Sequence, residues 1–141
     1  MPPHNLRGDM NTSAAPSPLP TALPGQPLDG ATWDAMIQTA GPQEALWLVR
    51  QIASDLDRMQ SGLRAALADG DRNAIRRISH ALAGLGGTIG ASVLHGAALD
   101  LNAAGYQGDK PFVAAQGGAV LSALAAVMTQ VSDHLRLAGG R

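Results

Sequence analysis

The sequence predicts an all-α protein: an antiparallel, up-down four-helix bundle with a short helix and a disordered tail at its N-terminus. Large apolar residues recur at alternating steps of three and four along residues 43–68 and 72–89, which gives each of these two predicted helices one apolar face. No segment alternates apolar and polar residues over a useful length, so no sheet is expected. The breaks between the segments are short, which favours antiparallel neighbours. Of the 141 residues, 45% are hydrophobic, which is enough to bury the core of one domain.

Residues 1–27 are predicted to form a flexible tail, because they hold seven of the nine prolines together with Ser, Thr, Ala and Gly. These prolines are Pro2, Pro3, Pro16, Pro18, Pro20, Pro24 and Pro27. The predicted helical domain covers residues 28–138.

The helices are expected at about 29–39, 43–68, 72–89, 91–104 and 109–138. Asp29 can cap the first helix, and the Gly41-Pro42 pair separates it from the long second one. Asp71 can cap the third helix, and Gly90 is expected to end it. The last helix opens with Pro111 in its first turn, where proline is tolerated.

His80 lies on the polar side of the third helix. The large apolar residues of this helix stand at positions 75, 78, 82, 85 and 89, which form one stripe. At about 100° per residue, His80 lies roughly opposite that stripe and is expected to point into solvent. The residues expected on the same broad face are Arg76, Ala83, Gly84, Gly87 and Ala91.

This face is nearly bare, although helix surfaces usually carry Lys, Glu and Gln. A glycine inside a helix is less favourable than Ala by about 1 kcal/mol, and three glycines stand at 84, 86 and 87. Such a cost indicates that a neighbouring element or another molecule must come close. The alternative that these residues leave open is an ordinary surface His on a helix rich in Ala and Gly.

A longer pattern runs from this helix into the next. It reads His80-Ala81-Leu82-Ala83-Gly84, and after five more residues Gly90-Ala91-Ser92-Val93-Leu94, with the pair Leu99-Asp100 beyond. This pattern resembles the histidine phosphotransfer (HPt) domain family of bacterial phosphorelays. The family pattern is His-x-Leu-Lys-Gly, a few small residues, then Gly-Ala, two residues and Leu, and often a closing Leu-acidic pair. The order of the predicted helices is also similar to that of the family.

The resemblance implies that His80 carries a phosphoryl group and that Gly84 leaves space for it. Gly87 and Ala91 would then belong to the face on which a partner docks.

Ala83 departs from the family pattern, which has a Lys close to the phosphoryl group at that place. Arg76 and Arg77 are the nearest cationic side chains that could support the phosphoryl group instead.

By the same resemblance, the chain is a phosphorelay intermediate that accepts a phosphoryl group from a receiver-domain aspartate and passes it to another receiver. Its partners would be response-regulator receiver domains and a hybrid or sensor histidine kinase. The receiver would bring the divalent metal, so the chain is expected to need no cofactor of its own and to be a carrier without autonomous catalysis. The alternative is a helical adaptor or regulatory module with the same bundle and no phosphoryl chemistry, which Ala83 makes conceivable.

Composition argues against several other classes of function. The chain has no Cys, so it has no disulfides and no Cys-based zinc site. A net charge of −1 argues against nucleic-acid binding. No run of about 18 apolar residues predicts a membrane span, and no N-terminal apolar region predicts a secretory signal. A cytoplasmic protein is therefore expected. A monomer is also expected, although nothing in the composition indicates the oligomeric state.

Two further kinds of site are disfavoured. A dinucleotide-binding glycine loop would need Gly at position 89, which is Ile89, and a strand before it. His80 and His95 fall on different predicted helices, and no His-x-x-x-His or Glu-x-x-His pair occurs, so no metal site is expected.

Overall fold

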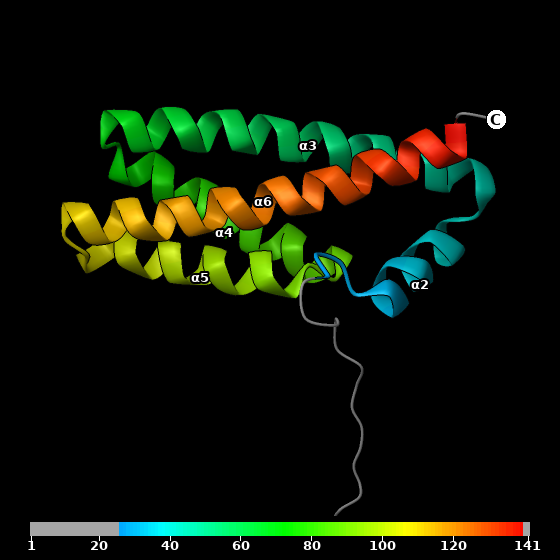
Figure 1. The fold of residues 1–141 in the computed structure, drawn as a ribbon, viewed down its shortest axis with the longest axis horizontal. Helices are drawn as coiled ribbons and strands as arrows, with labels where there is room; N and C mark the ends of the chain where they lie inside the picture. Colours follow the sequence, from blue (N-terminus) through cyan, green and yellow to red (C-terminus); the bar gives the residue numbers. More distant parts are fainter. Residues whose placement is uncertain (1–25, 140–141) are drawn as a thin grey trace, which may run out of the picture.

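The structure is a computed structural model that describes residues 26–139. Its helices are α2 (Gly30–Ala40), α3 (Pro42–Asp69), α4 (Arg72–Ile89), α5 (Ser92–Gln107) and α6 (Lys110–Gly139), and this part of the chain contains no strand (Figure 1). The predicted all-α fold is confirmed. The largest difference in bounds is at the end of α5, which runs three residues beyond the predicted Ala104. The predicted tail lies outside the described residues, apart from positions 26 and 27.

Helices α3, α4, α5 and α6 form the bundle. The neighbouring pairs are α3 with α4, α4 with α5, α5 with α6, and α6 with α3, so the four helices surround one core. Successive helices run in opposite directions in Figure 1, as short connections require. The short helix α2 contacts α3 and α4 at one end of the bundle.

The two turns that flank α4 are set by local sequence. Gly70 and Gly90 have φ angles of +69° and +82°, a left-handed conformation that favours glycine at helix ends. Asp71 caps α4 as predicted, because its Oδ1 accepts a hydrogen bond of 3.1 Å from the backbone N–H of Ala74. These turns fix where α4 begins and ends, and therefore where His80 lies along the bundle.

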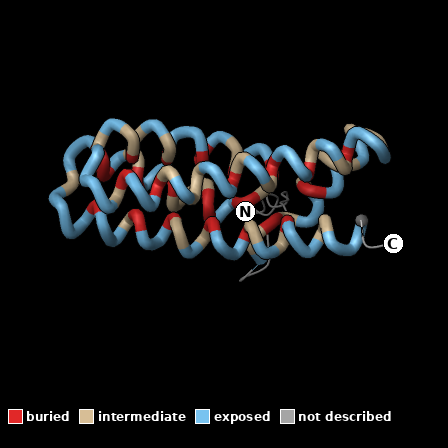
Figure 2. The backbone as a smooth tube through the Cα atoms, turned by 90° about the horizontal axis from the view of Figure 1, so that it is seen from above, coloured by how far each residue is buried: buried red, intermediate tan, exposed pale blue. Residues whose placement is uncertain are grey.

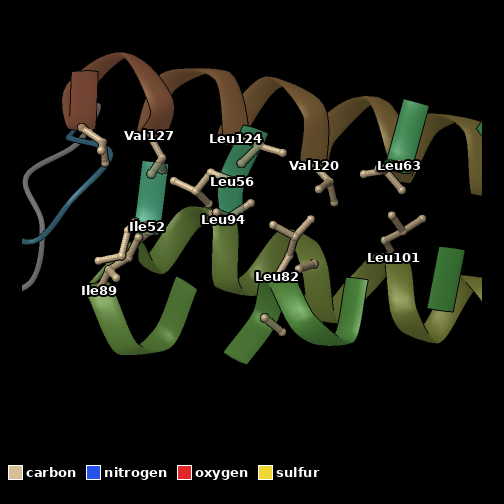
Figure 3. Close-up of a cluster of buried hydrophobic side chains, with 14 of the residues drawn as sticks. Ile52, Leu56, Leu63, Leu82, Ile89, Leu94, Leu101, Val120, Leu124 and Val127 are labelled. Atoms are coloured by element: carbon tan, nitrogen blue, oxygen red, sulfur yellow. The ribbon is translucent and has the colours of Figure 1, made fainter. Parts of the chain in front are cut away.

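The core runs along the inner faces of the bundle helices, where the buried positions face one another (Figure 2). Fully buried side chains from all four helices meet there, as the close-up in Figure 3 shows. They include Leu56, Leu63, Leu82, Ile89, Leu94, Leu101, Val120, Leu124 and Val127. Ser79 is the buried polar residue of this region, and its Oγ donates a hydrogen bond of 3.1 Å to the carbonyl of Arg76 on the same helix.

Hydrogen bonds join α2 and the residue before it to the C-terminal ends of α4 and α6. Trp33 is 6% exposed, and its Nε1 donates a hydrogen bond of 3.4 Å to Nδ1 of His134 near the end of α6. The N–H of Asp29 donates to the carbonyl of Gly90 at 2.7 Å. The apolar residues Trp33, Met36 and Ile37 of α2 pack against the core at this end of the bundle.

Helix α6 is more apolar than expected. By length and composition, Lys110–Ala138 could cross a membrane, which contradicts the expectation that no segment could. Single Gln and Ser residues interrupt the apolar run without adding charge, so a count of consecutive apolar residues misses it. In the structure α6 is a bundle helix that packs against α3 and α5 and buries Val113, Val120, Leu124, Val127 and Val131.

Candidate functional site

Helix α4 has a buried face wider than the predicted apolar stripe. Ile75, Leu82 and Ile89 of the stripe are fully buried, while positions 78 and 85 are only half-buried. The burial extends instead to the small residues Ser79, Ala83 and Gly86. The cause is the close approach of α5: a Cβ atom on Gly86 would lie 3.2 Å from the backbone N of His95.

His80 is exposed, as predicted, in the middle of α4. The exposed positions of this helix are Asn73, Arg77, His80, Ala81, Gly84, Gly87 and Thr88. His80 therefore stands one turn after Arg77 and one turn before Gly84 on the solvent side.

The space next to His80 is open at Gly84 and partly filled at Gly87. A Cβ atom on Gly84 would meet nothing within 4 Å, whereas one on Gly87 would lie 3.3 Å from Nδ1 of His95. The structure thus confirms the predicted open space on this face at Gly84. Two turns after His80, the imidazole of His95 packs so closely against Gly87 that a side chain there would have to displace it slightly.

Ala83 and Ala91 do not lie on the exposed face, and the expectation that they share it with His80 is wrong. Ala83 is 3% exposed and Ala91 is fully buried. Ala83 stands at the edge of α4 that α5 covers. Ala91 follows Gly90, whose left-handed backbone ends the helix, so the angular spacing of α4 no longer applies to it. Neither side chain can contact a docking partner directly.

His95 links α5 to the backbone of α4, a contact that the sequence analysis did not predict. Its Nδ1 donates a hydrogen bond of 2.7 Å to the carbonyl of Ala83. The sequence could have indicated this contact, because α4 and α5 form an antiparallel hairpin about the Gly90 turn. Residues equally distant from that turn lie opposite each other. Gly86 and His95 form one such pair, and Arg76 and Gly105 form another.

Arg76 fastens α4 to the end of α5. Its Nη1 donates to the carbonyl of Gly105 at 3.2 Å, and its guanidinium carbon lies 4.6 Å from the centre of the Tyr106 ring. The carbonyl of Arg76 accepts a hydrogen bond of 3.0 Å from Asn102 Nδ2. A Cβ atom on Gly105 would lie 2.7 Å from Cγ of Arg76, so the glycine makes room for the arginine stem.

Arg77, in contrast, is exposed. The two ion pairs within residues 26–139, Arg58–Asp55 and Arg136–Asp133, do not involve it. Of the two arginines expected near His80, Arg77 therefore lies on the solvent side with it. Arg76 instead packs against the end of α5.

Leu99 is a further exposed apolar residue near this face. It is 49% exposed, and it lies on α5 between His95 and Asn102, four and three residues away. Residues at this spacing share one side of a helix, and both neighbours bond to carbonyls of α4. Leu99 thus lies at the α5 edge that faces α4, and we call His80, Arg77, Gly84 and Leu99 the acceptor face.

The family model of the Hpt domain matches residues 47–134, which is more than half of the chain. The chain belongs to the Hpt domain family. The match runs from α3 to α6 and contains the whole of α4 with His80, while α2 lies outside it. No curated protein and no solved structure matches the chain.

Hpt domains are phosphocarrier modules in phosphorelays, where they work with receiver domains and histidine kinases. The resemblance stated from the sequence is therefore confirmed at the level of the family. Within residues 26–139, no group of three His, Asp or Glu side chains lies close enough to hold a metal ion.

Proposed function

We propose that His80 is the phosphoacceptor of this Hpt domain. The observation that carries the proposal is its exposed imidazole in the middle of α4, beside the open space at Gly84. The other two histidines of the described chain are half-buried and engaged: His95 bonds to the carbonyl of Ala83, and His134 accepts from Trp33. Of these three histidines, only His80 has an imidazole that a phosphoryl donor or acceptor on another protein can reach.

The transfer that we propose is a reversible exchange of one phosphoryl group. The lone pair of an imidazole nitrogen of His80 forms the N–P bond while the O–P bond of a receiver's aspartyl phosphate breaks, and the aspartate leaves as a carboxylate. Positioning and charge stabilisation dominate such reactions. An exposed side chain on a rigid bundle helix supplies the positioning, and the partner receiver supplies the attacking or leaving aspartate and a divalent metal.

The acceptor face has the composition that such docking requires. Gly84 lets the partner's surface come close, Leu99 offers an apolar contact, and Arg77 offers a positive charge one turn from His80. We further propose that the protein acts as a cytoplasmic monomer without catalysis of its own. It would pass the phosphoryl group between response-regulator receivers downstream of a hybrid or sensor kinase.

The alternative function is a helical adaptor that binds receivers but carries no phosphate. Ala83 favours it, because no lysine stands at the place where the family has one. A receiver domain charged with acetyl phosphate separates the two functions: a phosphocarrier gains label from it, whereas an adaptor binds it and stays unlabelled.

Gly84→Gln should slow phosphoryl transfer from the receiver without weakening the fold. Gln favours helix over Gly by several tenths of a kcal/mol, and its Cβ atom would meet nothing within 4 Å. The slowing is therefore expected to come from steric conflict with the partner. Gly118→Gln on α6 is the matched control, because Gly118 is also helical, exposed and open but does not lie on α4 or α5. Equal transfer rates in both variants would show that no partner approaches Gly84.

Arg77→Gln should slow transfer several-fold and leave the free energy of unfolding unchanged. Arg76→Gln should instead lower that free energy by about 1 kcal/mol, because it removes a half-buried hydrogen bond to Gly105 and the contact with Tyr106. Rates of transfer and urea unfolding, measured on both variants, test the division of roles. If only the Arg76 variant transferred more slowly, Arg76 and not Arg77 would be the residue that supports the phosphoryl group.

A further inference from the structure

A cavity of about 430 Å³ lies where the α3–α4 turn meets the start of α6. Figure 1 shows that this end of the bundle is opposite α2. Its apolar lining includes Leu67, Ile75, Val113 and Leu121. Ile75 belongs to α4, so residues of α3, α4 and α6 all line the cavity. The volume lies within the range of about 300–1,000 Å³ that is usual for small-molecule sites, and such sites are mostly apolar with a few polar groups.

Two adjacent glycines of α6, of which the second lines this cavity, have different surroundings. A Cβ atom on Gly117 would lie 2.7 Å from both terminal carbons of Leu67, so packing accounts for a glycine there. A Cβ atom on Gly118 would meet nothing within 4 Å, and Gly118 lines the cavity. Glycine is unfavourable within a helix, and packing gives no reason for it at this second position. A side chain at Gly118 would extend from the lining of the cavity into space that no other residue fills.

The charged residues that line the cavity are both basic. Arg72 and Lys110 stand at the starts of α4 and α6. Two of the neighbouring carboxylates bond to backbone N–H groups: Asp71 accepts from the N–H of Ala74, and Asp109 accepts from the N–H of Phe112 at 2.9 Å. Arg72 makes one hydrogen bond of 3.4 Å to the carbonyl of Gly105, which leaves most of its N–H groups available.

We propose that this cavity binds a free small amphiphile with one apolar chain and one anionic group, such as a chain carboxylate. The chain lies between Leu67, Val113 and Leu121, and the anionic group meets Arg72 and Lys110 at the opening. Burial of the chain supplies affinity, and the two cations select the charge of the ligand. This site is separate from the acceptor face and does not depend on the function proposed for His80.

Titration of the full chain with decanoate, below the concentration at which it forms micelles, tests the proposal. Calorimetry should show saturable binding, and amide chemical shifts should change at Val113 and Gly118. Decanol, which has the same chain without the charge, should bind more weakly. Lys110→Gln should weaken decanoate about two- to fivefold, as expected for one exposed charge, and leave decanol unaffected.

Gly118→Leu provides the decisive variant, because its side chain would fill the open space. It should abolish decanoate binding while circular dichroism shows an unchanged fold, since Leu favours helix. The matched control is Gly96→Leu on α5, which should bind as the natural chain does. Absence of saturable binding to the natural chain would overturn the proposal. So would equal binding by the two Leu variants, or binding only to anionic lipid vesicles.

Discussion

His80→Gln should abolish acceptance of a phosphoryl group from a charged receiver. Gln keeps a polar side chain of moderate size but has no nucleophilic ring nitrogen. The free energy of unfolding should change by less than about 0.5 kcal/mol, because His80 is exposed and away from the core. Transfer of labelled phosphate and urea unfolding measure the two quantities on the same preparation.

His95→Gln is the matched control for that experiment. It removes the other imidazole near the acceptor face, whose Nδ1 holds the carbonyl of Ala83. A loss of about 1 kcal/mol of stability is expected, with phosphoryl acceptance retained. Label retained in the His80 variant, or lost only in the His95 variant, would contradict the assignment of the phosphoacceptor.

Ala83→Lys should destabilise the protein by about 1–3 kcal/mol rather than restore the lysine of the family pattern. Ala83 is 3% exposed, and α5 covers the edge of α4 on which it lies. The Lys side chain must push α4 and α5 apart or extend along the interface between them to reach solvent. Overfilling a packed region in this way usually lowers the stability of the fold. Ala81→Lys, at an exposed position of α4, should cost less than about 0.5 kcal/mol.

Thermal and urea unfolding of these two lysine variants measure the difference. Unchanged stability of the Ala83 variant together with faster acceptance would mean that the lysine reaches the phosphoryl group past α5. In that case, the absence of the family lysine would be a direct loss of charge stabilisation and not a consequence of close helix packing.

The helices and the exposure of His80 could be predicted because both depend on short-range sequence. Asp71 and Gly90 set the ends of α4 through their own backbone and side-chain geometry. The angular position of His80 relative to Leu82 follows from helix geometry alone. Such features need no knowledge of what packs against the helix, so the sequence was sufficient for them.

The edges of the acceptor face could not be predicted, because they depend on how closely α5 approaches α4. That approach buries Ala83, directs Arg76 toward Gly105, and brings His95 over Gly87. A helix considered alone shows only that these positions lie between its apolar and polar sides. The cavity beside Gly118 has the same origin, since it exists only where α3, α4 and α6 meet.

The most direct test of the proposed function is to locate the phosphate on the protein. The chain is mixed with an acetyl-phosphate-charged receiver and a divalent metal, quenched in base, digested, and mapped by mass spectrometry. The expected result is one acid-labile, base-stable phosphate on the peptide that contains His80. Phosphate on His95 or His134, an acid-stable phosphate, or none from any receiver that binds the chain would contradict the proposal.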